Sequence, residues 1–303
     1  MRRWLIAGIL LCGLSLGVLL AHVAHHQEQR VLEERRQWHA RRAGWEELKG
    51  EIWGEVRRFK GESALFVEDL ATGWKAGYRE GKPFPAASVV KMAILAAYLR
   101  AVDEGRIQPG QRLTLRRKDK VQGSGVLKEL PDGTQQTAEE LAGLMIARSD
   151  NTAANLLIDL LGLEYLNDSF RRMGLKETRL SRKMMDFSLR RRGVENVTTA
   201  EETALVWRRF YDREVGGGEA ARGWMELLKG QEIRDRIPAL LPPGTVVANK
   251  TGLERGVCHD SGILFGPRGD LLICVLTRNG SASRPAKKFI ARVARHAWRY
   301  CAQ

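Results

Sequence analysis

The sequence predicts an α/β protein of the α+β kind, with strands near both ends of the domain and helices between them. Strand patterns occur at 64–78, 246–251, 261–265 and 271–277. Helical periodicity dominates the intervening segment, at 138–147, 152–161, 165–173, 199–211 and 217–229. A closing helix is expected over 287–300, and Thr199 with Glu202 fits a capping box.

Length and composition are those of a globular protein. The chain has 303 residues, of which 44% are hydrophobic and 28% are charged. These values exclude a disordered, collagen-like or polytopic membrane protein, and they allow one large domain or two modest ones. Four cysteines in this length exclude a disulfide scaffold. The net charge of +14 permits anionic partners but identifies none.

The N-terminal segment has the character of a membrane anchor. Residues 4–23 contain no Asp, Glu, Lys or Arg, and as a helix they would rise about 30 Å, enough to cross a bilayer core. Arg2 and Arg3 precede this run, as in a signal sequence, but no good cleavage site follows, because His22 stands where a small residue is wanted. We therefore expect residues 1–25 to form an uncleaved anchor rather than a cleaved signal.

Residues 26–44 are predicted to form a helical stalk ahead of a domain that starts at residue 45. Glycines at 44, 50 and 54 interrupt the apolar stripe and argue against a long continuous coiled coil, although a dimerising stalk stays possible. The stripe repeats every seven residues, at Val31, Trp38, Trp45, Ile52 and Phe59.

A lysine at the start of an apolar helix gives the first chemical signal. Residues 92–99 are all apolar, so this helix should be buried on every side. Burying the Lys91 ammonium without partners costs several kcal/mol, or else the lysine loses its proton. Ser88 lies three residues earlier on the same face, where an amine could activate its hydroxyl. The pair alone is weak evidence for a catalytic site, since an N-cap serine followed by a snorkelling lysine would give the same sequence pattern.

Two further motifs strengthen this interpretation. Ser149-Asp150-Asn151 begins 61 residues after Ser88 and opens a helical stretch, and Lys250-Thr251-Gly252 begins 101 residues after Ser149 in a strand-like run. Each motif alone is more often a cap or a turn. In this order and at these intervals, the three form the set of penicillin-recognising serine enzymes.

From about residue 45 to 303 the chain therefore resembles the class A β-lactamases and their relatives among the penicillin-binding serine hydrolases. The resemblance implies an antiparallel sheet covered by helices, from about 45–87 and 230–303, and an all-helical lobe from about 88–229. The site would lie between them. Oligomeric state is left open.

The resemblance also implies a role for each catalytic residue. Ser88 would attack a carbonyl carbon and become an acyl-serine, and Lys91 would move its proton as a general base or through a water. Ser149 would relay a proton to the departing nitrogen. Lys250 would hold the substrate carboxylate and lower the pKa of Lys91.

A second set of residues would bind substrate. Thr251 would share the carboxylate with Lys250, and Asn151 would bind the side-chain amide of the substrate. The backbone N–H groups of Ser88 and Leu253, the latter just after Gly252, would form the oxyanion hole. The substrate would be a β-lactam or an acyl-D-Ala-D-Ala peptide, with no cofactor, no metal and no nucleic acid.

The chain departs from this family at the loop that normally carries a deacylating glutamate. Met184 falls where that glutamate is expected, and a methionine cannot accept a proton. Asp186 and Glu195 are nearby carboxylates that could replace it. Glu195 or Asn196 is better suited to pair with Arg182 and pin the loop.

Other features have structural interpretations. Residues 256–262 suggest a longer connection than usual, and Ser261 stands where an arginine is common. His259 and Asp260 are adjacent and should point to opposite faces, which favours a structural role for Asp260.

Residues 122–125 form a glycine-rich turn that would line one wall of the site. Residues 190–192 suggest solvated surface or attraction to anionic lipids or wall polymers. A disulfide is possible, but free buried thiols are expected, at Cys258, Cys274 and Cys301.

The favoured function is a β-lactamase-like serine hydrolase that opens the β-lactam amide outside the cytoplasm, anchored to the bacterial cell membrane. The alternatives are a membrane-anchored D-Ala-D-Ala peptidase and a penicillin-binding protein or sensor that deacylates slowly.

Overall fold

The structure is a computed structural model that describes residues 2–278 and 283–302, with side chains in these ranges except at 2–21 and 218–221. The chain divides into two compact units, residues 1–50 and 51–303. Helix α1 (Arg2–Arg58) supplies the first unit and continues into the second. It runs without a break through Gly44, Gly50 and Gly54, because each helical glycine costs only about 1 kcal/mol relative to alanine.

Most of the predicted anchor lies in the range for which the structure does not describe side chains. Residues 4–21 of the run at 4–23 fall among those positions. Among the residues whose side chains are described, no helix has the length and apolar character to traverse a bilayer.

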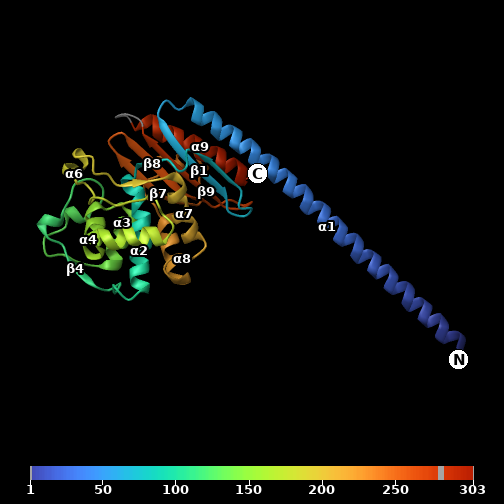
Figure 1. Cartoon of the computed structure of the whole chain (residues 1–303). Coiled ribbons are helices and arrows are strands. Elements are labelled where there is room, and N and C mark those ends of the chain that lie inside the picture. The colour runs from blue at the N-terminus through green and yellow to red at the C-terminus, as the bar shows by residue number, and fades with distance from the viewer. Residues whose placement is uncertain (1, 279–282, 303) are drawn as a thin grey trace. The chain divides into compact units, whose positions relative to one another are not determined.

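The second unit is built on a five-stranded antiparallel sheet of order β2-β1-β9-β8-β7, as the sequence predicts (Figure 1). Strand β7 lies at one edge. Two short pairs, β3 (Phe84–Pro85) with β6 (Val197–Thr198) and β4 (Arg112–Thr114) with β5 (Gln135–Thr137), complete the strands of the described chain. The main strands are β1 (Glu62–Asp69), β2 (Lys75–Tyr78), β7 (Val247–Glu254), β8 (Val257–Leu264) and β9 (Leu271–Arg278).

The prediction of a long connection after the Lys-Thr-Gly motif is wrong. Strands β7 and β8 are joined by the two residues Arg255 and Gly256 alone, and Gly256 adopts φ 78°. Residues 257–260 belong to β8 and pair with 251–254, Glu254 opposite Val257. Every side chain of β8 is buried, and this burial favours extending the strand over leaving these residues in a loop.

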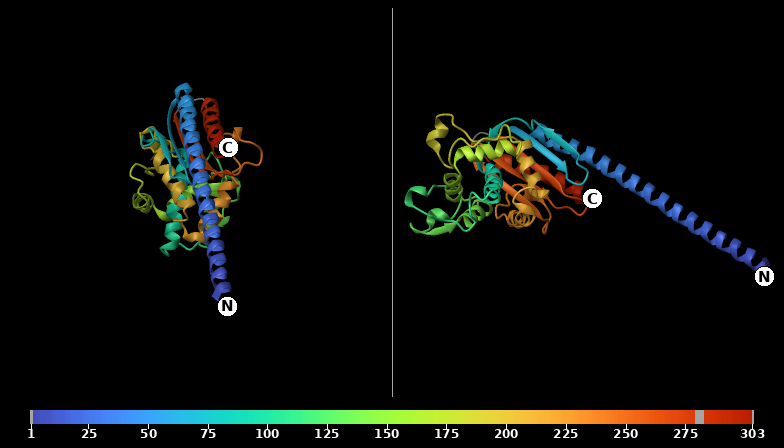
Figure 2. Two further views of the ribbon diagram at one scale, coloured as in Figure 1. Left: turned by 90° about the vertical axis from the view of Figure 1, so that its right-hand side faces the viewer. Right: turned by 60° about the horizontal axis from the view of Figure 1, so that its bottom comes forward.

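Both faces of the sheet are covered. Leu272, Cys274 and Leu276 of β9 belong to the same apolar core as the helices of the central segment. The alternate residues of β9 point to the opposite face, where α9 (Arg284–Ala302) lies (Figures 1 and 2). Cys258, Cys274 and Cys301 are free and buried, so the predicted free thiols are confirmed and the alternative disulfide is wrong.

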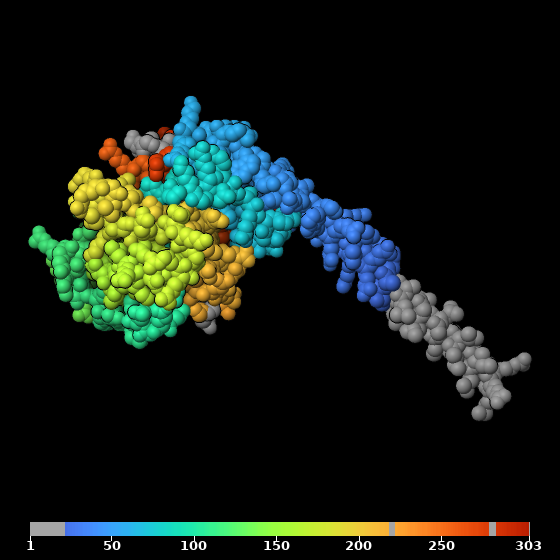
Figure 3. Space-filling model, in the orientation of Figure 1, coloured from blue at the N-terminus to red at the C-terminus, as the bar shows by residue number. Residues whose placement is uncertain are grey.

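The helical segment surrounds α2 (Lys91–Asp103), which follows the 3₁₀ turn η1 (Ala87–Val90). As predicted, residues 92–99 are all buried, and α2 packs against four other helices. The surface of this segment runs from green to orange in Figure 3. Its helices are α3 (Ala138–Ala147), α4 (Asn151–Leu161), α5 (Leu163–Arg172), α6 (Phe187–Arg191), α7 (Ala200–Tyr211) and α8 (Gly217–Lys229), with 3₁₀ turns η2 (Arg117–Asp119) and η3 (Leu127–Glu129).

Two details differ from the sequence pattern. Helices α7 and α8 lie in the predicted helical lobe but also pack against the sheet, α7 on β9 and α8 on β7. Thr199 caps α7 by accepting from Glu202 N–H. The Glu202 carboxylate does not complete a capping box, because it accepts instead from the N–H groups of residues 176–178. It therefore ties α7 to the entry of the loop that carries Met184.

Candidate active site

Lys91 occupies the first position of α2 and is completely buried. Its Nζ donates to the Ser149 carbonyl oxygen at 2.7 Å and to Asn151 Oδ1 at 2.7 Å, and it lies 3.3 Å from Ser149 Oγ. These oxygens compensate part of the cost of burying the amine. The first two motifs are therefore in direct contact, as the sequence predicts.

Lys250 reaches the same hydroxyl from the edge strand. It is also completely buried, and its Nζ lies 2.9 Å from Ser149 Oγ and 3.0 Å from the Thr251 carbonyl oxygen. A hydroxyl can donate one hydrogen bond and accept two, so Ser149 can connect both amines at once. The three motifs, far apart in the chain, form one site.

Burial lowers the basicity of both lysines, and each is lowered further by a neighbouring positive charge, Lys91 by Lys250 and Lys250 by Arg236. Burial, reinforced by the charge of Lys250, holds the pKa of Lys91 well below its usual value. Burial also lowers the pKa of Lys250 to about 7, against the attraction of Asp260. A lowered pKa is the direction that a lysine acting as a general base requires.

Local backbone geometry holds the two serines in place. Ser149 has φ 54° and Ala87, just before Ser88, has φ 44°, a left-handed conformation that costs about 1 kcal/mol or more for a residue with a Cβ. Gly252 allows the close approach of β7, since a Cβ there would lie 3.3 Å from Ala87 Cβ and from Val89 Cγ1. A side chain at position 252 would therefore crowd the turn that carries Ser88.

His259 and Asp260 have structural roles, as expected. His259 Nδ1 accepts from Thr277 N–H at 3.0 Å, so its Nε2 carries the hydrogen and donates to the Pro85 carbonyl at 2.7 Å. Burial lowers the pKa of His259 to about 4, which keeps this arrangement neutral. Asp260 accepts from Ile237 N–H and from Asn249 Nδ2, each at 3.0 Å, in η4 (Ile237–Leu240) and β7.

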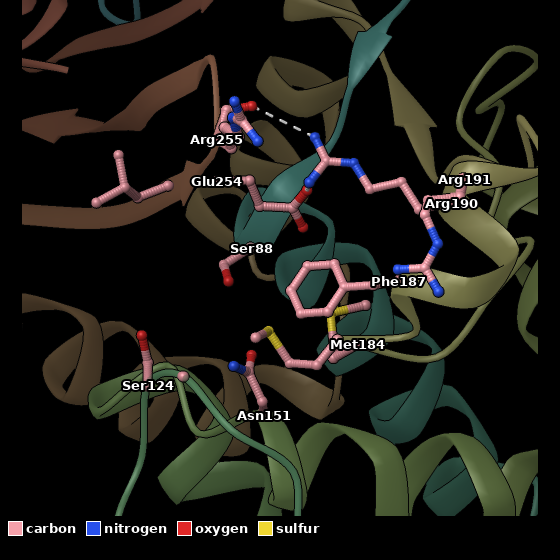
Figure 4. Close-up of a pocket in the computed structure, with 12 residues that line it drawn as sticks. Ser88, Ser124, Asn151, Met184, Phe187, Arg190, Arg191, Glu254 and Arg255 are labelled. Carbon is pink, nitrogen blue, oxygen red and sulfur yellow. Dashed lines mark hydrogen bonds and ion pairs between the residues drawn. The ribbon is translucent and has the colours of Figure 1, made fainter. Parts of the chain in front are cut away.

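Ser88 opens onto a cavity of about 780 Å³. Figure 4 shows Ser88, Ser124 and Asn151 around one side of it and Met184 and Phe187 on the other. Gly123 and Ser124 line it, which confirms the predicted wall, and Leu253 lines it next to the motif glycine. The lining residues are Ser88, Gly123, Ser124, Asn151, Met184, Met185, Phe187, Arg190, Arg191, Leu253, Glu254 and Arg255.

Asp150 and Gly125 fix the wall loop. The Asp150 carboxylate caps α4 through Ala153 N–H at 2.9 Å and accepts from Val126 N–H at 2.6 Å. A Cβ on Gly125 would lie 2.2 Å from Asp150 Cγ, so the loop can take this path only with glycine there. Asn151 Nδ2 adds a bond to the Gln122 carbonyl at 3.1 Å.

Met184 lies at the cavity, in the region where a deacylating glutamate was expected. Its backbone is held by Asn155, which accepts from Met184 N–H at 2.7 Å. Neither Asp186 nor Glu195 is among the described residues that line the cavity. Asp186 caps α6 through Leu189 N–H at 2.9 Å.

The loop is pinned as predicted. Arg182, only 2% exposed, pairs with Glu195 at 2.5 Å, and Asn196 Oδ1 accepts from Arg182 N–H at 2.9 Å. This pairing engages the Glu195 carboxylate in an ion pair within the loop.

One carboxylate and one arginine at the cavity differ from the sequence-based expectations. Glu254 lines the cavity and pairs with Arg190 at 3.0 Å, and burial raises its pKa despite that partner. The assignment of residues 190–192 to solvated surface is wrong for Arg190, which is partly buried and also pairs with Glu195 at 3.2 Å. Arg191 is exposed, but it lines the cavity. The sequence could have indicated Glu254 as a residue of the site, because it lies only two residues after Gly252 of the Lys-Thr-Gly motif.

Comparison with known proteins agrees with this geometry. The sequence model of the β-lactamase enzyme family matches residues 47–301. This chain belongs to that family. A β-lactamase of Kitasatospora aureofaciens is 30% identical over 247 residues, covering 77% of this chain and 78% of that protein.

Two solved structures are close in fold. The β-lactamase from Sphaerobacter thermophilus has a TM-score of 0.76 and 32% identity, covering 83% of this chain and 96% of the other. PBP-A, in a leucine-to-glutamate mutant described as an acyl-enzyme complex with penicillin G, has a TM-score of 0.77 and 28% identity, covering 84% and 95%. The predicted family and fold class are confirmed.

The lowered pKa of Lys250 predicts a specific pH dependence of stability. Between pH 7 and about 10 the unfolded chain binds more protons at this lysine than the folded chain does, so the free energy of unfolding should rise with pH. Lys250→Met should reduce this rise by up to about 1.4 kcal/mol per pH unit, while Lys91, whose pKa is also lowered, keeps its own contribution. Urea unfolding at pH 7, 8 and 9 measures it.

The matched control is Lys118→Met, at an exposed lysine. It should keep the pH slope of the parent protein. If the free energy of unfolding changed equally with pH in the parent protein and in Lys250→Met, the lowered pKa of Lys250 would be contradicted.

Proposed function

We propose that this protein is a serine hydrolase that opens β-lactams by forming an acyl-enzyme on Ser88. One observation carries the proposal: Ser149 Oγ lies within 3.3 Å of two completely buried amines, Lys91 and Lys250, beside the cavity that holds Ser88. A structural lysine pair would be expected to carry carboxylate partners. Membership of the β-lactamase enzyme family supports the same chemistry.

The proposed acylation uses each group once. Ser88 Oγ attacks the β-lactam carbonyl carbon while its proton passes to Lys91, directly or through a water. The backbone N–H groups of Ser88 and Leu253 stabilise the developing oxyanion. The carbon–nitrogen bond then breaks, and the nitrogen receives a proton through Ser149. Lys250 and Thr251 hold the substrate carboxylate, and Asn151 binds its side-chain amide.

Hydrolysis of the acyl-serine needs a water whose oxygen bonds to the acyl carbon while Ser88 regains a proton. Met184 cannot take a proton from that water, and Asp186 and Glu195 are engaged in a helix cap and an ion pair. This observation favours a second candidate: a D-Ala-D-Ala peptidase or penicillin-binding sensor whose acyl-enzyme persists. The acyl-enzyme described for PBP-A supports that possibility.

Intact-mass spectrometry against time separates these functions. Benzylpenicillin should add its mass to the protein, and Ser88→Ala should abolish the adduct. Turnover of a chromogenic cephalosporin with rapid loss of the adduct identifies a β-lactamase. An adduct that persists for hours, with Ser88-dependent release of D-Ala from a stem peptide, identifies the peptidase. No adduct with the parent protein would reject both.

A carboxylate at position 184 should speed deacylation. Met184 is only 5% exposed and lines the cavity, so a glutamate there would be desolvated, with a raised pKa suited to a base. Met184→Glu should shorten the adduct lifetime by roughly 10²-fold, a typical contribution from one general base. The lifetime is read from the same mass spectra.

Met184→Gln is the matched control because glutamine has a similar size and cannot accept the proton. It should leave the lifetime long. Equal lifetimes in the two variants would contradict the assignment of position 184 to the deacylation step.

We also propose that residues 4–23 anchor the chain to the bacterial cell membrane with the domain outside the cytoplasm. The uncharged apolar run and the preceding Arg2 and Arg3 support this proposal. The full-length chain should resist extraction by alkaline carbonate and should be digested by protease added to spheroplasts. Recovery in the carbonate supernatant would contradict it.

A further inference from the structure

The cavity in front of Ser88 has a strongly basic end. Three arginines line it, Arg190 and Arg191 from α6 and Arg255 from the turn after β7. Glu254 is the single carboxylate among the described lining residues. The cavity lining therefore carries more positive charge than its one acidic group can neutralise.

The three arginines are not equivalent. Arg190 is engaged by Glu254 and Glu195, at 3.0 and 3.2 Å. Arg191 and Arg255 are exposed, and within the described ranges neither guanidinium has a hydrogen-bond or ion-pair partner. Figure 4 shows Arg191 on the side of the cavity that carries Phe187. Two guanidinium groups are thus free to pair with a ligand.

The position of this basic end along β7 indicates which part of a substrate it meets. Arg255 follows Lys250 by five residues, a separation of roughly 16 Å in an extended strand. Lys250 would hold the substrate carboxylate on the leaving-group side. Since Leu253, the proposed oxyanion donor, lies between the two, Arg255 would face the acyl side of the scissile amide. Arg190 donates to the Arg255 carbonyl oxygen at 3.4 Å, so α6, which carries Arg191, reaches the same end of β7.

Apolar side chains accompany the charges at this end. Phe187 is 45% exposed and Leu253 is 48% exposed, and both line the cavity with Met184 and Met185. Exposed large apolar groups beside unpaired guanidiniums suit a ligand that is partly apolar and partly anionic. Guanidinium groups pair with carboxylates in a bidentate geometry.

We infer that the site selects acyl donors with a second anionic group, a carboxylate on the acyl side of the scissile amide, in addition to the one that Lys250 would hold. The inference rests on the proposed acyl-serine function and deepens it. It makes Arg191 and Arg255 specificity-determining residues.

Three penicillins that differ at one substituent test this inference. Benzylpenicillin, carbenicillin and ampicillin carry hydrogen, a carboxylate and an amine at the same side-chain carbon. The second-order rate constant for adduct formation on Ser88, measured by intact-mass spectrometry with the full chain, should be about tenfold higher for carbenicillin than for benzylpenicillin and lowest for ampicillin. Raising the salt concentration should narrow the differences.

The double variant Arg191→Gln/Arg255→Gln should bring the ratio of carbenicillin to benzylpenicillin close to one. Arg192→Gln, at an exposed arginine that is not among the described lining residues, should keep the parent ratio. Equal rates for the three penicillins in the parent protein would overturn the inference while leaving the acyl-serine function intact. The absence of any adduct would overturn both.

Discussion

The site depends on one shared contact, the hydroxyl of Ser149 between two buried amines. Both amines lose solvation in this dry interior, and the charge of Lys250 opposes a charge on Lys91, so the fold holds both lysines at lowered pKa. In the proposed mechanism, Lys91 would accept a proton and Lys250 would hold an anionic group of the substrate. Ser149, held at φ 54°, keeps the two amines linked.

Much of the surrounding fold serves to hold that contact. Gly252 lets β7 approach the turn that carries Ser88, and His259 links Pro85 to β9 through Thr277. Asp260 is near Lys250, and its negative charge opposes the loss of the lysine proton. Because β7 is an edge strand, its other side is free of neighbouring strands in the described sheet and can face a substrate.

Acylation and deacylation are supported unequally. Lys91, Ser149 and Lys250 are buried and in contact with one another, whereas Met184 brings an apolar side chain to the cavity. The ion pair between Arg182 and Glu195 keeps the loop closed at its neck without supplying a base. The same loop brings Arg190 and Arg191 to the cavity.

The sequence by itself determined the strands, most helices and the catalytic motifs, because each has a local signature. A lysine beside an uninterrupted apolar helix, and a serine one turn before it, need no tertiary information to be noticed. Only the tertiary structure decided that β7 and β8 meet in a two-residue turn and that Glu202 binds residues 176–178. It also decided that Glu254, Arg190 and Arg191 line the cavity. The ion pair between Arg190 and Glu254 joins a loop and a strand about 60 residues apart, and such a pair leaves no periodic trace in the sequence.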